Sequence, residues 1–150
     1  MTHKLENYFK DYMEYHQTSG NQICHFLGIP MITLSLLGML SMVTFGSEMW
    51  QTSLFRPDLG LALLILGLSF YFYIDWKIAL PFALVLTGFY FLGRTLPIQV
   101  LVALQVLGWI FQYIGHLKFE QRSPAFYKNL AHVFIGPLWV FSKAVGYAKL

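Results

Sequence analysis

Charged side chains are scarce in this chain. Asp, Glu, Lys and Arg make up 11% of its 150 residues, whereas a soluble domain usually carries about 25%. Hydrophobic residues make up 57%, and aromatic residues, which favour bilayer interfaces, make up 18%. These proportions exclude an ordinary soluble domain. They predict a membrane protein in which residues 1–150 form a single membrane-embedded domain.

Cysteine and clustered basic residues are also nearly absent. Cys24 is the only cysteine, so an internal disulfide is excluded. The net charge is only +3 and the basic residues are scattered, which argues against a nucleic-acid partner and fits a surface of membrane lipid. Residues 1–18 contain five charged side chains, so no cleavable signal peptide is predicted there.

Long uncharged runs are present instead. Residues 26–47 and 95–117 contain no Asp, Glu, Lys or Arg, and each run is long enough to cross a hydrocarbon core of about 30 Å. Residues 59–74 and 78–93 are shorter apolar runs on either side of residues 75–77, which predicts a tight helical hairpin. The predicted fold class is therefore all-α, a polytopic membrane helical bundle with about four spanning helices.

Amphipathic or interfacial helices are expected at both ends of this bundle. Residues 5–18 place tyrosines and other apolar residues on one face of a charged helix, which suits a membrane interface. Residues 19–21 (SGN) are expected to end this helix at the glycine, with the serine or the asparagine capping the next one. Residues 130–140 are apolar but contain Gly136-Pro137. This pattern predicts a broken helix or a pair of short helices, with a fifth full span as the alternative.

The basic residues predict an orientation. With a cytoplasmic amino terminus and four spans, only Arg56 and Arg94 of the ten lysines and arginines lie on the far side. The eight on the cytoplasmic side are Lys4, Lys10, Lys77, Lys118, Arg122, Lys128, Lys143 and Lys149. The same arrangement brings four of the five histidines to the cytoplasmic leaflet. An integral membrane protein with its site on the cytoplasmic side is therefore expected.

These four histidines form a candidate metal site. The proposed ligands are His16, His25, His116 and His132. Neutral imidazole is the commonest transition-metal ligand, and two histidines with one carboxylate hold iron(II) in many oxygen-using enzymes. The residues alone leave iron, zinc and copper open. The sequence contains no HxxxH or HxxHH box, so the pattern of fatty-acid desaturases and hydroxylases is absent.

Polar residues near the histidines are candidates for catalytic roles. Gln105, Gln112, His116 and Glu120 follow one another at spacings of seven, four and four and would form one polar stripe on a helix. Glu120 can supply an oxygen ligand or accept a hydrogen bond from one. Tyr12 and Asn21 each precede a histidine by one turn and can orient ligands or substrate. The alternative is that the glutamines pair neighbouring helices, Asn21 is only a cap and Glu120 pairs with a surface base.

Several motifs resemble those of a known family. They are residues 12–16 (YMEYH), 21–30 (NQICHFLGIP), 112–120 (QYIGHLKFE), 122–125 (RSPA) and 136–138 (GPL). These runs are similar to the signatures of the 2-hydroxy fatty acid dioxygenase family. The resemblance covers nearly the whole chain, and the two histidine-bearing motifs are specific in their spacing.

The resemblance implies an iron(II)-dependent dioxygenase of lipid metabolism. Such an enzyme uses Fe²⁺ and O₂ for alpha-oxidation, which converts a 2-hydroxy fatty acid into the acid one carbon shorter. The resemblance gives the iron-site role to His16, His25 and His116, whereas His132 is included on position alone. It also implies a small protein of the endoplasmic reticulum or of a bacterial inner membrane. The alternative is a non-enzymatic membrane module that binds lipid or metal.

Overall fold

The computed structural model describes residues 1–46, 54, 56–124 and 130–148. Within these ranges the chain forms helices joined by short connections and contains no β-strand, which confirms the predicted all-α fold class. Lys128 and Lys149, which contribute to the predicted orientation, lie outside the described residues. Residues 47–53 and 55, in the connection that leads from the first apolar helix to the next, lie outside them as well.

Three helical stretches are long and apolar enough to cross a membrane. They are α2 (Ser19–Leu40), α4 (Leu59–Thr95), and α5 (Ile98–Ile114) together with its π-helical continuation η1 (Gly115–Glu120). In hydrocarbon every backbone N–H and C=O must be paired within the protein, and a helix achieves this within one segment. The chain is therefore a membrane protein, as its composition predicts.

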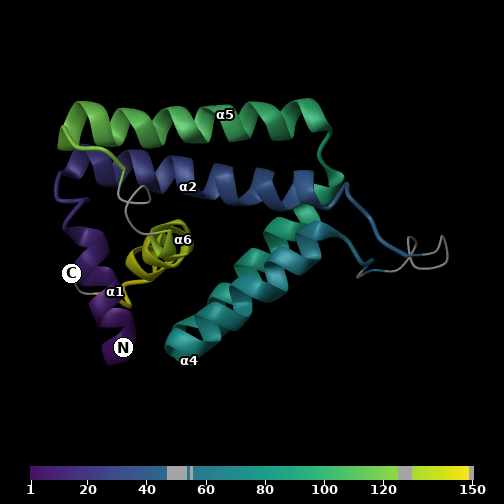
Figure 1. Ribbon diagram of the computed structural model, residues 1–150, viewed down its shortest axis with the longest axis horizontal. Coiled ribbons are helices and arrows are strands. Elements are labelled where there is room, and N and C mark those ends of the chain that lie inside the picture. Colours follow the sequence, from purple (N-terminus) through teal and green to yellow (C-terminus); the bar gives the residue numbers. More distant parts are fainter. Residues whose placement is uncertain (47–53, 55, 125–129, 149–150) are drawn as a thin grey trace.

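α2 and α5 lie side by side and run in opposite directions (Figure 1). Their backbones meet at Gly28 and Gly108. A Cβ atom on Gly28 would lie 2.7 Å from the Gly108 carbonyl oxygen, so a larger residue would push the helices apart. Farther along, Ser35 Oγ hydrogen-bonds to the Gln105 side chain at 2.6 Å. These contacts fix the register of the two helices that carry the candidate histidines.

α4 is two helices in space. Its backbone leaves the helical region at Asp75, where φ is −156° and ψ is 99°. The Tyr90 hydroxyl donates a hydrogen bond of 2.8 Å to the Asp58 carboxylate, although a straight helix would hold these two residues about 48 Å apart. The chain therefore folds back on itself, and Figure 1 shows the two halves side by side. This confirms the predicted helical hairpin and gives four apolar helices.

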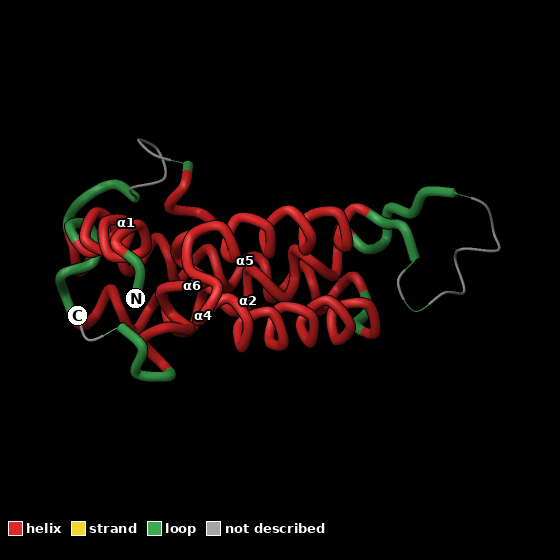
Figure 2. Tube along the Cα trace, turned by 90° about the horizontal axis from the view of Figure 1, so that it is seen from below, coloured by secondary structure: helices red, strands yellow, loops and turns green. Residues whose placement is uncertain are grey.

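The hairpin tip and both ends of the chain lie together. The Asp75 carboxylate accepts hydrogen bonds from the Thr2 backbone N–H at 2.8 Å and from the Tyr147 hydroxyl at 3.0 Å. Figure 2 shows α1 (His3–Met13) and the chain ends at one end of the molecule, opposite the connection between α2 and α4. The candidate histidines lie at this same end.

The carboxy-terminal segment forms one continuous helix, α6 (Ala131–Ala144), with Pro137 inside it. The broken helix or pair of short helices predicted here is therefore wrong. A proline inside a helix costs about 3 kcal/mol. Fully burying the side chains of Ile135, Leu138 and Trp139 offsets this, since each contributes about 1.5–3 kcal/mol. At 14 residues, or about 21 Å, α6 is too short for a fifth full span.

α1 buries Leu5, Phe9 and Tyr12 on one face, which confirms its amphipathic character. It ends at Met13, however, five residues earlier than predicted. The helix ends early because of tertiary contacts. Side chains from the first turn of α2 donate hydrogen bonds to the backbone carbonyl groups of Tyr15 and His16, which follow α1. His16 therefore lies in the connection between α1 and α2 and not on a helix.

Candidate metal centre

Three histidines from three parts of the chain meet at one end of the bundle. His16 lies in the connection after α1, His25 lies near the start of α2, and His116 lies in η1. One ring nitrogen of each lies within 4.8 Å of those of the other two, and all three side chains are buried. The three nitrogens can therefore reach a single ion.

Hydrogen bonds determine which ring nitrogens carry protons. His16 Nδ1 donates to the Tyr12 carbonyl at 2.6 Å, and His25 Nδ1 donates to the Asn21 carbonyl at 2.9 Å. Because a carbonyl oxygen can only accept, both Nδ1 atoms carry hydrogen, and in the neutral rings both Nε2 atoms present lone pairs. These Nε2 atoms lie 3.0 Å apart. Two lone pairs at this distance repel each other unless a cation binds them.

A metal ion satisfies this pair better than a proton. Burial, followed by the neighbouring His25, lowers the pKa of His16 to about 2, so the His16 imidazole is neutral at physiological pH. Two imidazole nitrogens that bind one metal at about 2.1 Å and at right angles to each other lie about 3.0 Å apart. The observed separation matches this value. The donor set thus fits a divalent transition metal.

Other buried polar atoms around the cluster also lack protein partners. Among the described residues, no hydrogen bond reaches His116 Nδ1, Gln112 Nε2 or His132 Nδ1, and all three residues line the cavity described below. Buried polar atoms are nearly always hydrogen-bonded in native proteins, so three orphans in one place call for a ligand. Their position beside the histidines is consistent with a site for a metal and a polar substrate group.

The π-helical turn η1 brings His116 to the cluster. Such turns are rare and occur frequently at functional sites. At its first residue, Gly115, a Cβ atom would lie 2.4 Å from Asn21 Oδ1, so only glycine permits this approach to α2. Gln112, at the end of α5, and His116 both line the cavity described below.

Glu120 lies outside the group of three histidines. Its carboxylate accepts hydrogen bonds from the Thr18 backbone N–H at 2.7 Å and from the Thr18 hydroxyl at 3.1 Å. Thr18, and not the predicted Ser19 or Asn21, is the N-cap of α2, since its side chain accepts from the Asn21 N–H. Glu120 thus ties the end of η1 to the connection that carries His16.

Removing this tie should loosen the metal site without removing a ligand. We expect Glu120→Ala to weaken metal binding by about 10–100-fold, the usual effect of losing a residue that orients a ligand. Glu120→Gln should lose less, because one carbonyl oxygen can still accept from Thr18. Competition titration against a metal-binding dye measures the affinity. Glu14 is an exposed glutamate at the end of α1, so Glu14→Ala is the matched control. Equal metal affinities in Glu120→Ala and Glu14→Ala would contradict a role for Glu120 in positioning the metal site.

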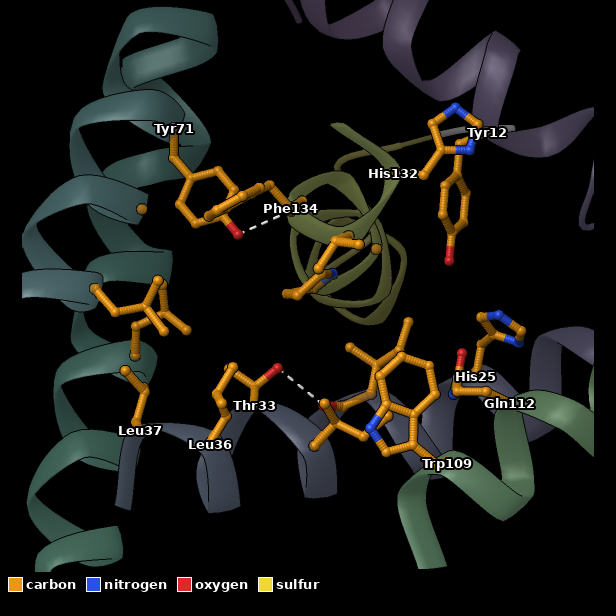
Figure 3. Close-up of a pocket in the computed structure, with 18 of the residues that line it drawn as sticks. Tyr12, His25, Thr33, Leu36, Leu37, Tyr71, Trp109, Gln112, His132 and Phe134 are labelled. Atoms are coloured by element: carbon orange, nitrogen blue, oxygen red, sulfur yellow. Dashed lines mark hydrogen bonds between the residues drawn. The ribbon is translucent and has the colours of Figure 1, made fainter. Parts of the chain in front are cut away.

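His132 lines the cavity but is not one of the three clustered histidines. Its Nε2 lies 2.7 Å from Asp11 Oδ2, and its ring packs edge-on against Tyr12 at 5.6 Å. Tyr12 in turn stacks on His16, with ring centroids 3.8 Å apart. Burial raises the pKa of Tyr12, so its hydroxyl stays protonated, and Figure 3 shows this hydroxyl pointing into the cavity.

The cavity beside the histidines has a volume of about 170 Å³. Its polar end is formed by Tyr12, His16, His25, Gln112, His116 and His132. The rest of its lining is mainly apolar and comes from α2, α4, α5 and α6 (Figure 3). A polar group with an apolar tail fits such a space.

Three residues that hold the site in place are missed by sequence reasoning. Gln22 Nε2 donates to the His16 carbonyl at 2.8 Å, and Lys143 Nζ donates to Gln22 Oε1 at 2.6 Å. Asp11 is the third, through His132. Gln22 lies beside Asn21 in the first turn of α2, and this position in the sequence could have identified it as a residue near the site. Asp11 and Lys143 meet partners 121 residues away, which no local pattern reveals.

The fold and site define a class: an integral membrane helical bundle with a buried three-histidine cluster at the polar end of an apolar cavity. The chain belongs to the 2-hydroxy-palmitic acid dioxygenase Mpo1-like family, whose model matches residues 2–148. The suspected family is thereby confirmed. No curated protein and no solved structure matches the chain. The family's description names a dioxygenase of a 2-hydroxy fatty acid, and the clustered histidines are compatible with it.

Proposed function

We propose that this chain is an iron(II)-dependent dioxygenase that converts a 2-hydroxy fatty acid into the fatty acid one carbon shorter. One observation carries the proposal: the facing Nε2 atoms of His16 and His25 lie 3.0 Å apart. His116 completes this buried donor set, which lies at the polar end of an apolar cavity. Family membership supplies the substrate class and the use of O₂.

The reaction balances with O₂ as the only oxidant. The bond between C1 and C2 breaks, C1 leaves as carbon dioxide and C2 becomes the new carboxyl carbon. The overall balance is R–CHOH–COOH + O₂ → R–COOH + CO₂ + H₂O, in which the four electrons lost by these two carbons reduce one O₂. Iron(II), when bound, would supply redox chemistry that no side chain offers. Neither a 2-oxo acid nor an external reductant is needed.

The chain's own residues would hold and orient the reacting groups. The three clustered histidines would hold the iron. The carbonyl groups of Tyr12 and Asn21 keep two of these rings in the tautomer that leaves Nε2 free. The Tyr12 hydroxyl and the Gln112 amide are available to donate hydrogen bonds to the carboxylate or hydroxyl of the substrate. His132, oriented by Asp11, is placed to accept or pass on a proton at the edge of the cavity.

The membrane setting also belongs to the proposal. The substrate's tail would lie among the apolar helices, and its polar end would reach the histidines near the headgroup level. The lysine and arginine asymmetry of the sequence supports a site on the cytoplasmic side. The membrane would be the endoplasmic reticulum or a bacterial inner membrane, as for other members of this family.

The test compares 2-hydroxypalmitate with palmitate, which differ only in the 2-hydroxyl. We expect pentadecanoate to form from 2-hydroxypalmitate with iron(II) and O₂ alone. Palmitate should react at least about 10⁴-fold more slowly, because a site built around a substrate hydroxyl rejects the analogue that lacks it. Mass spectrometry of the products measures both rates. Equal rates would contradict the mechanism, and bound lipid without any turnover would favour a non-enzymatic module.

A further inference from the structure

The cavity has a polar end and an apolar end. Figure 3 shows this division, with Tyr12, His25, Gln112 and His132 on one side of the view and Leu36, Leu37 and Tyr71 on the other. Leu36 follows His25 by 11 positions on the same helix, so the cavity lining extends about 16 Å along α2 from the histidines. The apolar end is therefore the part that would hold a hydrocarbon tail.

Gly67 is an unusual member of the apolar wall. It lies in the first half of α4 and is buried, yet among the described residues a Cβ atom there would meet only the Tyr71 ring within 4 Å, at an ordinary contact distance of 3.8 Å. A buried glycine with open space before it faces a cavity, and Gly67 does line this one. Gly28, by contrast, is pressed against the α5 backbone. The missing side chain at position 67 leaves space inside the cavity.

The side chains that surround Gly67 would direct a larger side chain at this position into the cavity. Tyr71, one turn later, cannot swing aside freely because its hydroxyl donates a hydrogen bond of 2.8 Å to the Phe134 carbonyl. Leu64, one turn earlier, and Leu86, from the other half of the hairpin, are both 5% exposed and line the same space. A side chain at position 67 would therefore project into the apolar end.

We propose that Gly67 sets the length of the acyl chain that this site accepts. The inference rests on the proposed function, since it assigns the apolar end of the cavity to the tail of a 2-hydroxy fatty acid. Each methylene group displaced from an apolar cavity weakens binding by about fourfold. Leucine at position 67 adds four carbon atoms, so it should exclude about that number of tail carbons.

The test measures which acids bind, independently of turnover. Anaerobic protein in lipid nanodiscs is incubated with an equimolar mixture of 2-hydroxy fatty acids of about 10 to 18 carbons, and the bound acids are identified by mass spectrometry. We expect Gly67→Leu to shift the bound distribution toward shorter acids by about four carbons relative to wild type. Comparing each variant with wild type at every chain length cancels the different partitioning of the acids into lipid.

The chain offers a matched control on the other half of the same hairpin. Gly88 is exposed, and a Cβ atom there would meet nothing within 4 Å among the described residues. Gly88→Leu makes the same change in the same element and should leave the distribution unchanged. Thermal unfolding of both variants tests their folding. If Gly67→Leu does not fold, Gly67→Ala replaces it, with an expected shift of about one carbon.

The outcomes separate this inference from the proposed function. A shift toward shorter acids in the position-67 variant alone supports it. An unchanged distribution in a folded position-67 variant overturns the inference and leaves the proposed function standing. A shift in Gly88→Leu equal to that in Gly67→Leu has the same two consequences. If wild type binds no acid of any length, both the inference and the proposed function fail.

Discussion

Replacement of His25 or His116 by alanine is expected to remove most of the bound metal and to abolish turnover of 2-hydroxypalmitate. Each change deletes one of three buried imidazole nitrogens that lie within 4.8 Å of one another. The remaining two histidines leave the coordination shell incomplete. A bound metal contributes several kcal/mol to catalysis, so its loss corresponds to at least about a thousandfold in kcat/KM.

His3→Ala is the matched control for these variants. The His3 side chain is 99% exposed at the start of α1 and lies outside the cluster, so its loss should change neither metal content nor turnover. Elemental analysis and a product assay on the same preparations give both quantities. His25→Gln, which keeps most of the side-chain volume, separates loss of a ligand from loss of packing. Full metal occupancy and turnover in His116→Ala would show that the site is wrongly assigned.

Exchange of iron for zinc is expected to leave metal binding intact and turnover absent. Zinc binds the same imidazole nitrogens as iron but has no redox chemistry. The protein is stripped with a chelator and reloaded anaerobically with either metal, after which oxygen consumption is followed with 2-hydroxypalmitate present. Activity should return with iron(II) alone. Full activity of the zinc form, or of the stripped protein, would rule out the proposed mechanism.

The helices were predictable because the membrane restricts the choices. A long uncharged run in hydrocarbon has to pair all of its backbone groups locally, so the runs that became α2 and α5 could only be helices. The charged and aromatic residues at 75–77 predicted the hairpin, and Asp75 is where the backbone leaves the helical region. These features depend on the local sequence alone.

The connection that carries His16 was not predictable, because distant side chains shape it. Asn21 Nδ2 donates to the Tyr15 carbonyl at 3.1 Å, Gln22 takes the next carbonyl, and Glu120 holds Thr18 from 102 positions away. These bonds replace the last turn that the apolar pattern of residues 5–18 predicts. The π-helical turn at His116 likewise depends on contact between Gly115 and α2, which no periodicity encodes.

The candidate site was partly predictable from topology. An even number of spans between His25 and His116 places them at the same end of the bundle, and the structure brings both together with His16. Their role as ligands remains a prediction. The two glutamines of the predicted polar stripe on α5 lie in different environments. Gln112 lines the cavity, whereas Gln105 pairs with Ser35 of the neighbouring helix α2, which is the alternative raised for the glutamines. Helical spacing alone does not distinguish these two environments.

The most direct test of the central claim is X-ray absorption spectroscopy at the iron edge, on wild-type protein purified without added metal and quantified for iron per chain. Binding of iron by His16, His25 and His116 predicts a stoichiometric ion whose nearest shell includes three imidazole nitrogens at about 2.1 Å. A protein that retains turnover with no iron, or with iron whose shell contains no imidazole, would contradict it.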